Sequence, residues 1–134
     1  MDLVKRLEEY RDRERELMWE GNFAQYFEIA TKKPEVARLS HERIYHMIMD
    51  AGVDTTRTGE PRYKFFSQEI FGIEKPLQQI VDYFHSAAQR LEVRKRVLLL
   101  MGPVGGGKST IVYLIKRGLE AYSRTSEGAM YAIK

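Results

Sequence analysis

The sequence predicts an α/β protein in which an N-terminal helical segment precedes the start of a P-loop parallel-sheet domain, with helix predominating over the 134 residues. Two observations lead to this fold class. Five apolar residues in a row, residues 97–101, are typical of a parallel strand buried on both faces. Residues 102–109 follow directly and fit G-x-x-x-x-G-K-[ST], and apolar residues at helical spacing come next. The loop therefore lies between a predicted strand and a predicted helix, as phosphate binding requires.

The residue types in this loop suit a nucleoside triphosphate. Glycines let backbone N–H groups converge on phosphate oxygens, and a helix from about Lys108 directs its positive end at the anion. Lys108 is predicted to reach the β- and γ-phosphates, and the Ser109 hydroxyl to bind Mg²⁺. The predicted nucleotide-binding residues of the loop are Gly102, Pro103, Val104, Gly105, Gly106, Gly107, Lys108, Ser109 and Thr110, with Ser109 as the metal ligand. No catalytic residue is predicted.

Composition limits the function classes. The chain is 43% hydrophobic and 31% charged, which is ordinary for a soluble globular protein. Because bound phosphates already account for some surplus of Lys and Arg, the net charge of +3 does not indicate a nucleic-acid partner. The absence of cysteine excludes disulfides and thiolate chemistry. No apolar run approaches the ~18 residues of a membrane span, and the charged N-terminus is unlike a signal peptide, so we expect a cytoplasmic protein.

The region before the loop is predicted to be helical. Residues 2–20 form a charged helix with a thin apolar stripe, and Gly21 and Asn22 end it. Asn22 is predicted to cap a helix over residues 23–31, and Ser40 a helix over residues 41–51. His41 and His46 lie on different faces of that helix, so a shared metal site is not expected. Four aromatic residues are expected to form a small helical core: Trp19, Phe23, Tyr26 and Phe27.

Polar residues 54–62 are predicted to form a loop and to mark a domain boundary, with a helical region at 1–60 and the start of the nucleotide-binding domain at 61–134. Residues 63–66 are strand-like. Pro76 suits the first turn of a long helix, whose apolar positions are Leu77, Ile80, Val81, Phe84, Ala87, Ala88 and Leu91. A helix to about Ser123 follows the loop, and residues 129–133 alternate like the start of another strand.

After the loop, the sequence has no apolar strand that ends in Asp, no residue to orient an attacking water and no arginine finger. The chain is therefore interpreted as the N-terminal fragment of a longer protein, incomplete at its C-terminus. We expect this fragment alone to be inactive.

A short segment that ends in residues 71–74, then a helix, a strand and a P-loop, is similar to the start of an AAA+ ATPase module. In such modules the segment at residues 70–73 packs beside the adenine, so the resemblance implies that Phe71 and Gly72 contact the nucleotide. More specifically, the chain resembles the PrkA-type serine protein kinases of bacteria, whose N-terminal half is AAA-like. The residues that carry this likeness are 19–21, Phe23, Tyr26, 70–72, 83–85, Ala87, Ala88, 94–96, 98–104, 106–109, 116–122, Gly128 and 131–134.

The resemblance implies MgATP binding and, in the full-length enzyme, transfer of phosphate to serine of a protein substrate. It also implies a homo-oligomer formed through the AAA-like domain. Three alternatives stay open: an AAA+ ATPase that remodels or degrades proteins without phosphotransfer, a small-molecule P-loop kinase, and a domain that holds nucleotide without turnover.

Overall fold

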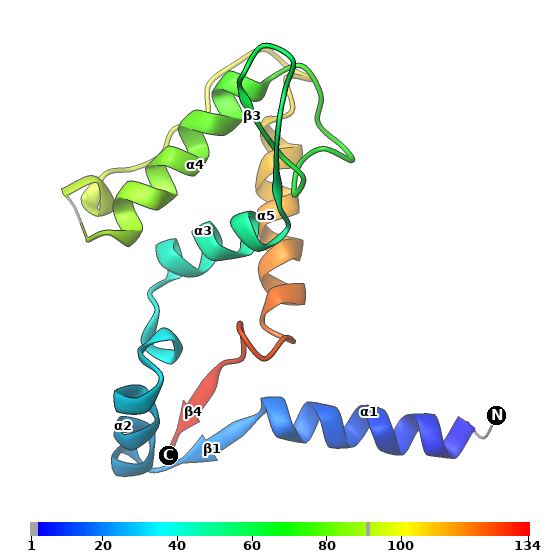
Figure 1. The fold of residues 1–134 in the computed structure, drawn as a ribbon, viewed down its shortest axis with the longest axis vertical. Coiled ribbons are helices and arrows are strands. Elements are labelled where there is room, and N and C mark those ends of the chain that lie inside the picture. Colours follow the sequence, from blue (N-terminus) through cyan, green and yellow to red (C-terminus); the bar gives the residue numbers. More distant parts are fainter. Residues whose placement is uncertain (1–2, 91) are drawn as a thin grey trace. The chain divides into compact units, whose positions relative to one another are not determined.

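The computed structural model describes residues 3–90 and 92–134, which are mostly helical with two pairs of short strands (Figure 1). The residues group into two compact units. Unit 1 combines the residues up to Arg38 with Glu120–Lys134, and unit 2 is Leu39–Leu119. The predicted predominance of helix is confirmed. The division into these two units does not test the predicted domain boundary near residue 60, which stays a prediction. In the described part of the chain, no helix has the length and apolar character that crossing a membrane requires.

Unit 1 begins with helix α1 (Leu3–Leu17), and strand β1 (Trp19–Gly21) follows it. Strand β1 pairs in parallel with β4 (Tyr131–Ile133). Strand β4 lies within residues 129–133, where the sequence predicts the start of a strand. The prediction that the first helix continues to residue 20 is wrong. The backbone of β1 instead bonds to a strand more than a hundred residues later, a partner that no local pattern reveals.

Helix α2 (Phe23–Lys32) begins where the sequence predicts. The Asn22 side chain accepts a hydrogen bond from the Gln25 backbone N–H at 3.0 Å, and the Gln25 side chain accepts one from the Asn22 N–H at 3.0 Å. This reciprocal pair is a capping box, which satisfies two N–H groups at the helix start. A short 3₁₀ helix, η1 (Pro34–Ala37), follows.

The aromatic core of unit 1 differs from the predicted one. The Trp19 ring centroid lies 6.5 Å from that of Tyr26 and 5.5 Å from that of Tyr131, so the cluster joins α2 to both strands. Phe23 and Phe27 contact each other but remain 64% and 62% exposed. The prediction that Phe23 and Phe27 belong to a small helical core is therefore wrong. Among the described residues, the aromatic contacts of α2 are made with the parallel strand pair and not with another helix.

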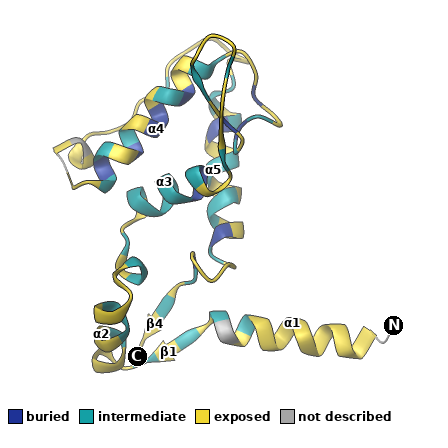
Figure 2. Cartoon of the chain, viewed as in Figure 1, coloured by how far each residue is buried: buried dark blue, intermediate teal, exposed yellow. Residues whose placement is uncertain are grey.

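Unit 2 is built on helix α3 (Ser40–Asp50), which packs against α4 (Glu74–Ala88). The buried side chains of the two helices are Met47, Ile48, Leu77, Ile80, Val81, Phe84 and Ala87 (Figure 2). Pro76 lies in the first turn of α4, as predicted, while Leu91 of the predicted stripe lies outside the described residues. Ser40 is the first residue of α3 rather than its cap, which is Leu39.

A hairpin replaces the loop that residues 54–62 were predicted to form. Strands β2 (Val53–Thr55) and β3 (Pro61–Tyr63) pair in antiparallel register, and the Thr56 hydroxyl donates to the Glu60 carbonyl at 3.0 Å across the turn. Three-residue strands are too short to show an alternation in sequence. Only Tyr63 of the strand-like segment 63–66 is in a strand, because residues 64–69 form turns. Burial raises the pKa of the Tyr63 hydroxyl above its ordinary value of 10.0, and the Asp82 carboxylate adds to this rise.

The predicted strand at residues 97–101 pairs with no strand among the described residues, so it is not a strand in this structure. The exposure still alternates: Val97, Leu99 and Met101 are 89%, 72% and 83% exposed, whereas Leu98 is 37% exposed, Leu100 is half-buried, and both line a cavity. The prediction that this segment is a strand buried on both faces is therefore wrong. A strand forms only by hydrogen bonding to a neighbouring strand, and without one the segment leaves most of its side chains exposed. A 3₁₀ helix, η2 (Glu92–Lys95), precedes this segment, and helix α5 (Lys108–Tyr122) follows the loop.

Candidate nucleotide-binding site

The glycine-rich loop turns sharply into α5. The Gly106 N–H donates to the Pro103 carbonyl at 3.1 Å, and the Ile111 N–H donates to the Gly107 carbonyl at 2.9 Å, which is the first bond of the helix. Gly105 and Gly107 have φ angles of 81° and 83°. Residues with a Cβ rarely adopt this left-handed conformation, so the backbone path depends on glycine at both positions. The predicted helix start at about Lys108 is confirmed.

The Lys108 side chain folds back over the loop. Its ammonium group donates to the Pro103 carbonyl at 2.7 Å and also to the Gly102 carbonyl. An ammonium group has three N–H donors, so one donor and the full positive charge remain for a ligand. Because two carbonyls already orient Lys108, its charge is held at the mouth of the loop before any anion binds.

Backbone N–H groups beside Lys108 are also available to a ligand. Gly107 precedes α5, and Lys108 and Ser109 begin its first turn. No described residue accepts a hydrogen bond from the backbone N–H groups of these three residues. Unsatisfied N–H groups at a helix N-terminus carry partial positive charge and bind phosphate oxygens. The residues therefore fit a polyphosphate: the N–H groups are free, and the Ser109 side chain is exposed beside them.

A cavity of about 670 Å³ joins this loop to the segment that precedes α4. It is lined by Glu69, Ile70, Phe71, Ile73, Val104, Gly105, Gly106, Gly107, Lys108, Ser109 and Thr110. Ile73 lies against the loop, since a Cβ added to Gly107 would be 3.7 Å from Ile73 Cδ1. Phe71 is 66% exposed, so its ring is accessible to a ligand in this cavity.

The structure brings together most of the residues that the sequence predicts for nucleotide binding. Phe71 and residues 104–110 line the cavity. Gly102 and Pro103 do not line it, and their carbonyls accept hydrogen bonds from Lys108. Gly72 does not line the cavity and provides a turn with φ of 75°. Sequence reasoning missed Glu69, which also lines this cavity and whose only signal is its position two residues before Phe71.

The metal prediction depends on Ser109 alone. Among the described residues no group of three or more His, Asp or Glu side chains is placed to hold a metal ion. Mg²⁺ keeps several waters and binds through few protein groups together with phosphate oxygens. The Ser109 hydroxyl fits such a shared site, in which it would be the protein ligand and the phosphates of the nucleotide would supply the negative charge.

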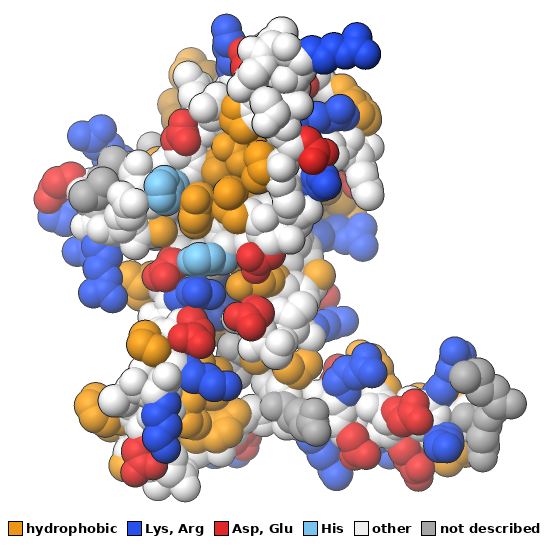
Figure 3. Space-filling view, viewed as in Figure 1, with side chains coloured by type: hydrophobic (Ala, Val, Ile, Leu, Met, Phe, Trp, Pro, Cys, Tyr) orange, Lys and Arg blue, Asp and Glu red, His pale blue; other side chains and the backbone are white. Residues whose placement is uncertain are grey.

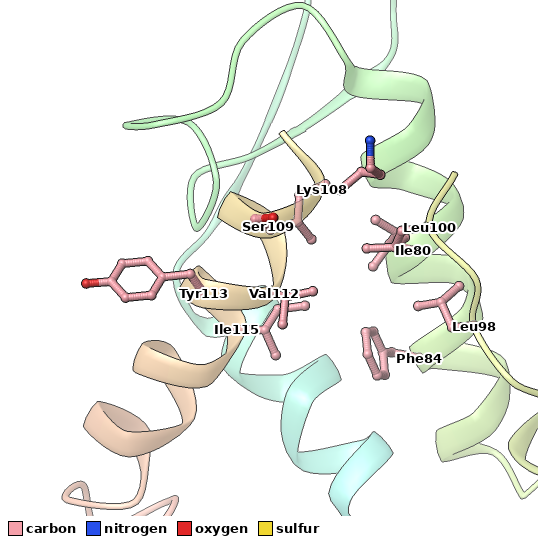
Figure 4. Close-up of a pocket in the computed structure, with 10 residues that line it drawn as sticks. Ile80, Phe84, Leu98, Leu100, Lys108, Ser109, Val112, Tyr113 and Ile115 are labelled. Carbon is pink, nitrogen blue, oxygen red and sulfur yellow. The ribbon is translucent and has the colours of Figure 1, made fainter. Parts of the chain in front are cut away.

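A second cavity, of about 650 Å³, lies on the other side of Lys108 and Ser109. Figure 4 shows Ile80 and Phe84 of α4 facing Val112 and Ile115 of α5 across it. Leu98 and Leu100 line the same space. Apart from Lys108 and Ser109, which line both cavities, its walls are mainly apolar, so it suits phosphates less well than the first cavity does.

A glycine-rich loop with two left-handed glycines, an oriented lysine and a helix start with free N–H groups is typical of the P-loop class of domain, in which such a loop receives nucleotide phosphates. Comparison with known proteins then gives the family. The model of the PrkA AAA domain matches residues 21–134, so the chain belongs to that family, whose AAA domain implies ATP binding. No solved structure matches the chain significantly.

Two relatives show how the family is described elsewhere. The chain is 53% identical over its whole length to the ATP-dependent protease PrkA of Bacillus subtilis, and it spans 21% of that protein. It is 49% identical over 55 residues to the serine/threonine kinase YeaG of Escherichia coli K12, a match that covers 41% of this chain and 8% of the relative. The chain therefore spans about a fifth of the length of the PrkA relative, and the two relatives carry different activities in their names.

Proposed function

We propose that this chain is the MgATP-binding part of a serine/threonine protein kinase, and that the whole protein transfers the γ-phosphate of ATP to serine of a protein substrate. The observation that carries the proposal is the pre-oriented Lys108 ammonium at a loop whose N–H groups are free. The kinase name of the Escherichia coli relative supports the choice of reaction.

In this proposal each part of the site has a separate task. The free N–H groups at the start of α5 hold the β- and γ-phosphate oxygens, and Lys108 neutralises charge on the phosphates. The Ser109 hydroxyl contributes one ligand to Mg²⁺, and Phe71 packs beside the base at the other end of the cavity. The chemistry of phosphoryl transfer needs little more than such positioning and charge stabilisation.

The second candidate is an AAA+ ATPase that drives protein degradation or remodelling without phosphotransfer. The name of the Bacillus subtilis relative, an ATP-dependent protease, favours it. A small-molecule P-loop kinase fits less well, since the family match begins at residue 21 and so includes the helical region before the loop.

The experiment compares the two fates of the γ-phosphate in the longer protein. Purified protein is incubated with γ-labelled ATP and a general protein substrate such as casein, and label on serine, free phosphate and cleaved peptide are measured together. Label on serine that disappears in a Lys108→Ala variant supports the kinase. Phosphate release with peptide cleavage and no labelled serine supports the protease and refutes the kinase. Lys116→Ala, an exposed lysine on the same helix, is the matched control.

A further inference from the structure

Helix α1 presents an apolar seam that the rest of its unit leaves largely uncovered. The seam consists of Leu3, Leu7, Tyr10 and Leu17, whose spacing of four, three and seven residues places them on one helix face. Leu3, Leu7 and Tyr10 are 74%, 54% and 55% exposed (Figure 2). The PrkA AAA domain match starts at residue 21, so α1 precedes the family domain and nothing in the nucleotide site uses it.

The seam continues into a groove at the end of the helix. This groove has a volume of about 350 Å³ and lies between the last turns of α1 and the segment that follows α5. Its apolar walls come from Tyr10, Leu17, Met18 and Met130, and both methionines are exposed, at 71% and 68%. All of these residues belong to unit 1. Methionine side chains adapt their shape to a bound partner, which suits a docking surface.

Arginines border the seam on both edges. At 100° per residue, Arg6 and Arg13 lie along one edge and Arg11 along the other. All three are exposed, and none forms a salt bridge with any residue that the structure describes. Figure 3 shows basic and acidic side chains together on the face of α1 in view.

The acidic residues of α1 avoid these edges. Glu8, Glu9 and Asp12 lie on the face opposite the seam, where they cannot pair with groups on a helix docked along it. Glu14 is the one carboxylate that the helix geometry places within the seam, so the arginines at its two edges outnumber the acidic groups on that face. An occupant of the seam gains most if it brings carboxylates to both edges.

We propose that α1 binds an amphipathic helix of a partner protein, one whose apolar stripe is flanked on both sides by Glu or Asp. A second copy of α1 is a poor occupant, because Arg6 would face Arg11 in a parallel pair and the edge arginines would face each other in an antiparallel pair. A membrane surface is also a poor occupant. Helix α1 has five basic and five acidic residues, so it lacks the net positive charge that attracts anionic lipid.

Glu14 gives the proposed complex a register. It lies within the seam, between Tyr10 and Leu17, and lines the groove at the end of the helix. A carboxylate at such a position is costly unless a cation faces it, so the partner helix carries one Lys or Arg opposite Glu14. One polar position in an otherwise apolar seam is the usual device for fixing how two helices align.

The test uses three designed helical peptides that share leucines along the stripe and one lysine to face Glu14, and that have Glu, Gln or Lys at every flanking position. Binding to the chain is measured by fluorescence anisotropy at low and high salt. We expect the Glu peptide to bind about tenfold more tightly than the Gln peptide, because at least three charge pairs form, and to lose this advantage at high salt. The Lys peptide should not bind.

Charge reversal provides the variant test. In the triple variant Arg6→Glu, Arg11→Glu, Arg13→Glu, the preference should invert toward the Lys peptide, while circular dichroism shows that the helix is kept. Lys5→Glu, on the opposite face of α1, is the matched control and should leave all three affinities unchanged. Replacing the facing lysine of the Glu peptide by leucine should weaken its binding to the unaltered chain and should not weaken its binding to the Glu14→Leu variant.

Four results would overturn the proposal. The first is equal binding of the three peptides, which would indicate a non-specific apolar contact. The second is self-association of the chain through α1 in sedimentation, abolished by Leu7→Glu. The third is binding to anionic vesicles that Leu7→Glu abolishes. The fourth is a longer protein containing this chain that does not bind the Glu peptide, because its own residues cover the seam.

Discussion

Replacing Lys108 by alanine tests the nucleotide site most directly. The variant loses the one ammonium group that the structure holds at the mouth of the loop, where it donates to the Gly102 and Pro103 carbonyls and keeps a third donor for phosphate. A charge-assisted hydrogen bond contributes about 1.5–3 kcal/mol. We therefore expect the affinity for MgATP to fall about ten- to a hundredfold.

The same variant should leave folding nearly unchanged. The hydrogen bonds of Lys108 are made to the exposed carbonyls of Gly102 and Pro103, which water can satisfy after the substitution. We expect the free energy of unfolding to change by less than about 0.5 kcal/mol, as for other exposed positions. A loss of affinity without a loss of stability separates a binding role from a structural one.

Isothermal titration calorimetry with ATP and Mg²⁺ measures the affinity, and thermal melting monitors the fold. Lys116→Ala removes an equal charge from an exposed position of α5 and should bind MgATP as the unaltered chain does. Unchanged affinity in the Lys108→Ala variant, together with an unchanged melting curve, would refute the assignment of the phosphate site to this loop.

Three further predictions concern other parts of the chain. Ser109→Ala should weaken nucleotide binding more in Mg²⁺ than in EDTA, measured by the same titration, and equal losses would contradict the proposed metal ligand. Gly118→Ala should lower the free energy of unfolding by about 1–2 kcal/mol in urea denaturation, because the added Cβ would lie 2.5 Å from Phe65 Cζ; a Phe65→Leu second substitution should restore part of it. Tyr63→Phe should reduce the loss of stability above about pH 10: the raised pKa keeps the buried hydroxyl neutral while the unfolded one ionises, so stability is complete below that pH and falls as pH rises. Melts from neutral to alkaline pH that show equal losses in both proteins would contradict this.

The sequence by itself determined those features of the protein that depend on interactions between residues close together in the chain. The glycines of the loop, the start of α5 at Lys108, the Asn22 cap of α2 and the position of Pro76 in α4 all follow from interactions within a few residues. Each depends on backbone geometry or on a side chain that bonds to a nearby N–H group, so a short stretch of sequence contains the whole cause.

The tertiary structure alone decided the features that depend on distant partners. Trp19 belongs to a strand because its partner is Tyr131, and the apolar segment at residues 97–101 is not a strand because no described strand pairs with it. The nucleotide cavity likewise needs Phe71 to meet a loop more than thirty residues further along the chain. Hydrogen bonding between strands and the closure of a cavity bring together residues far apart in sequence, and their free energy depends on contacts that no local pattern records.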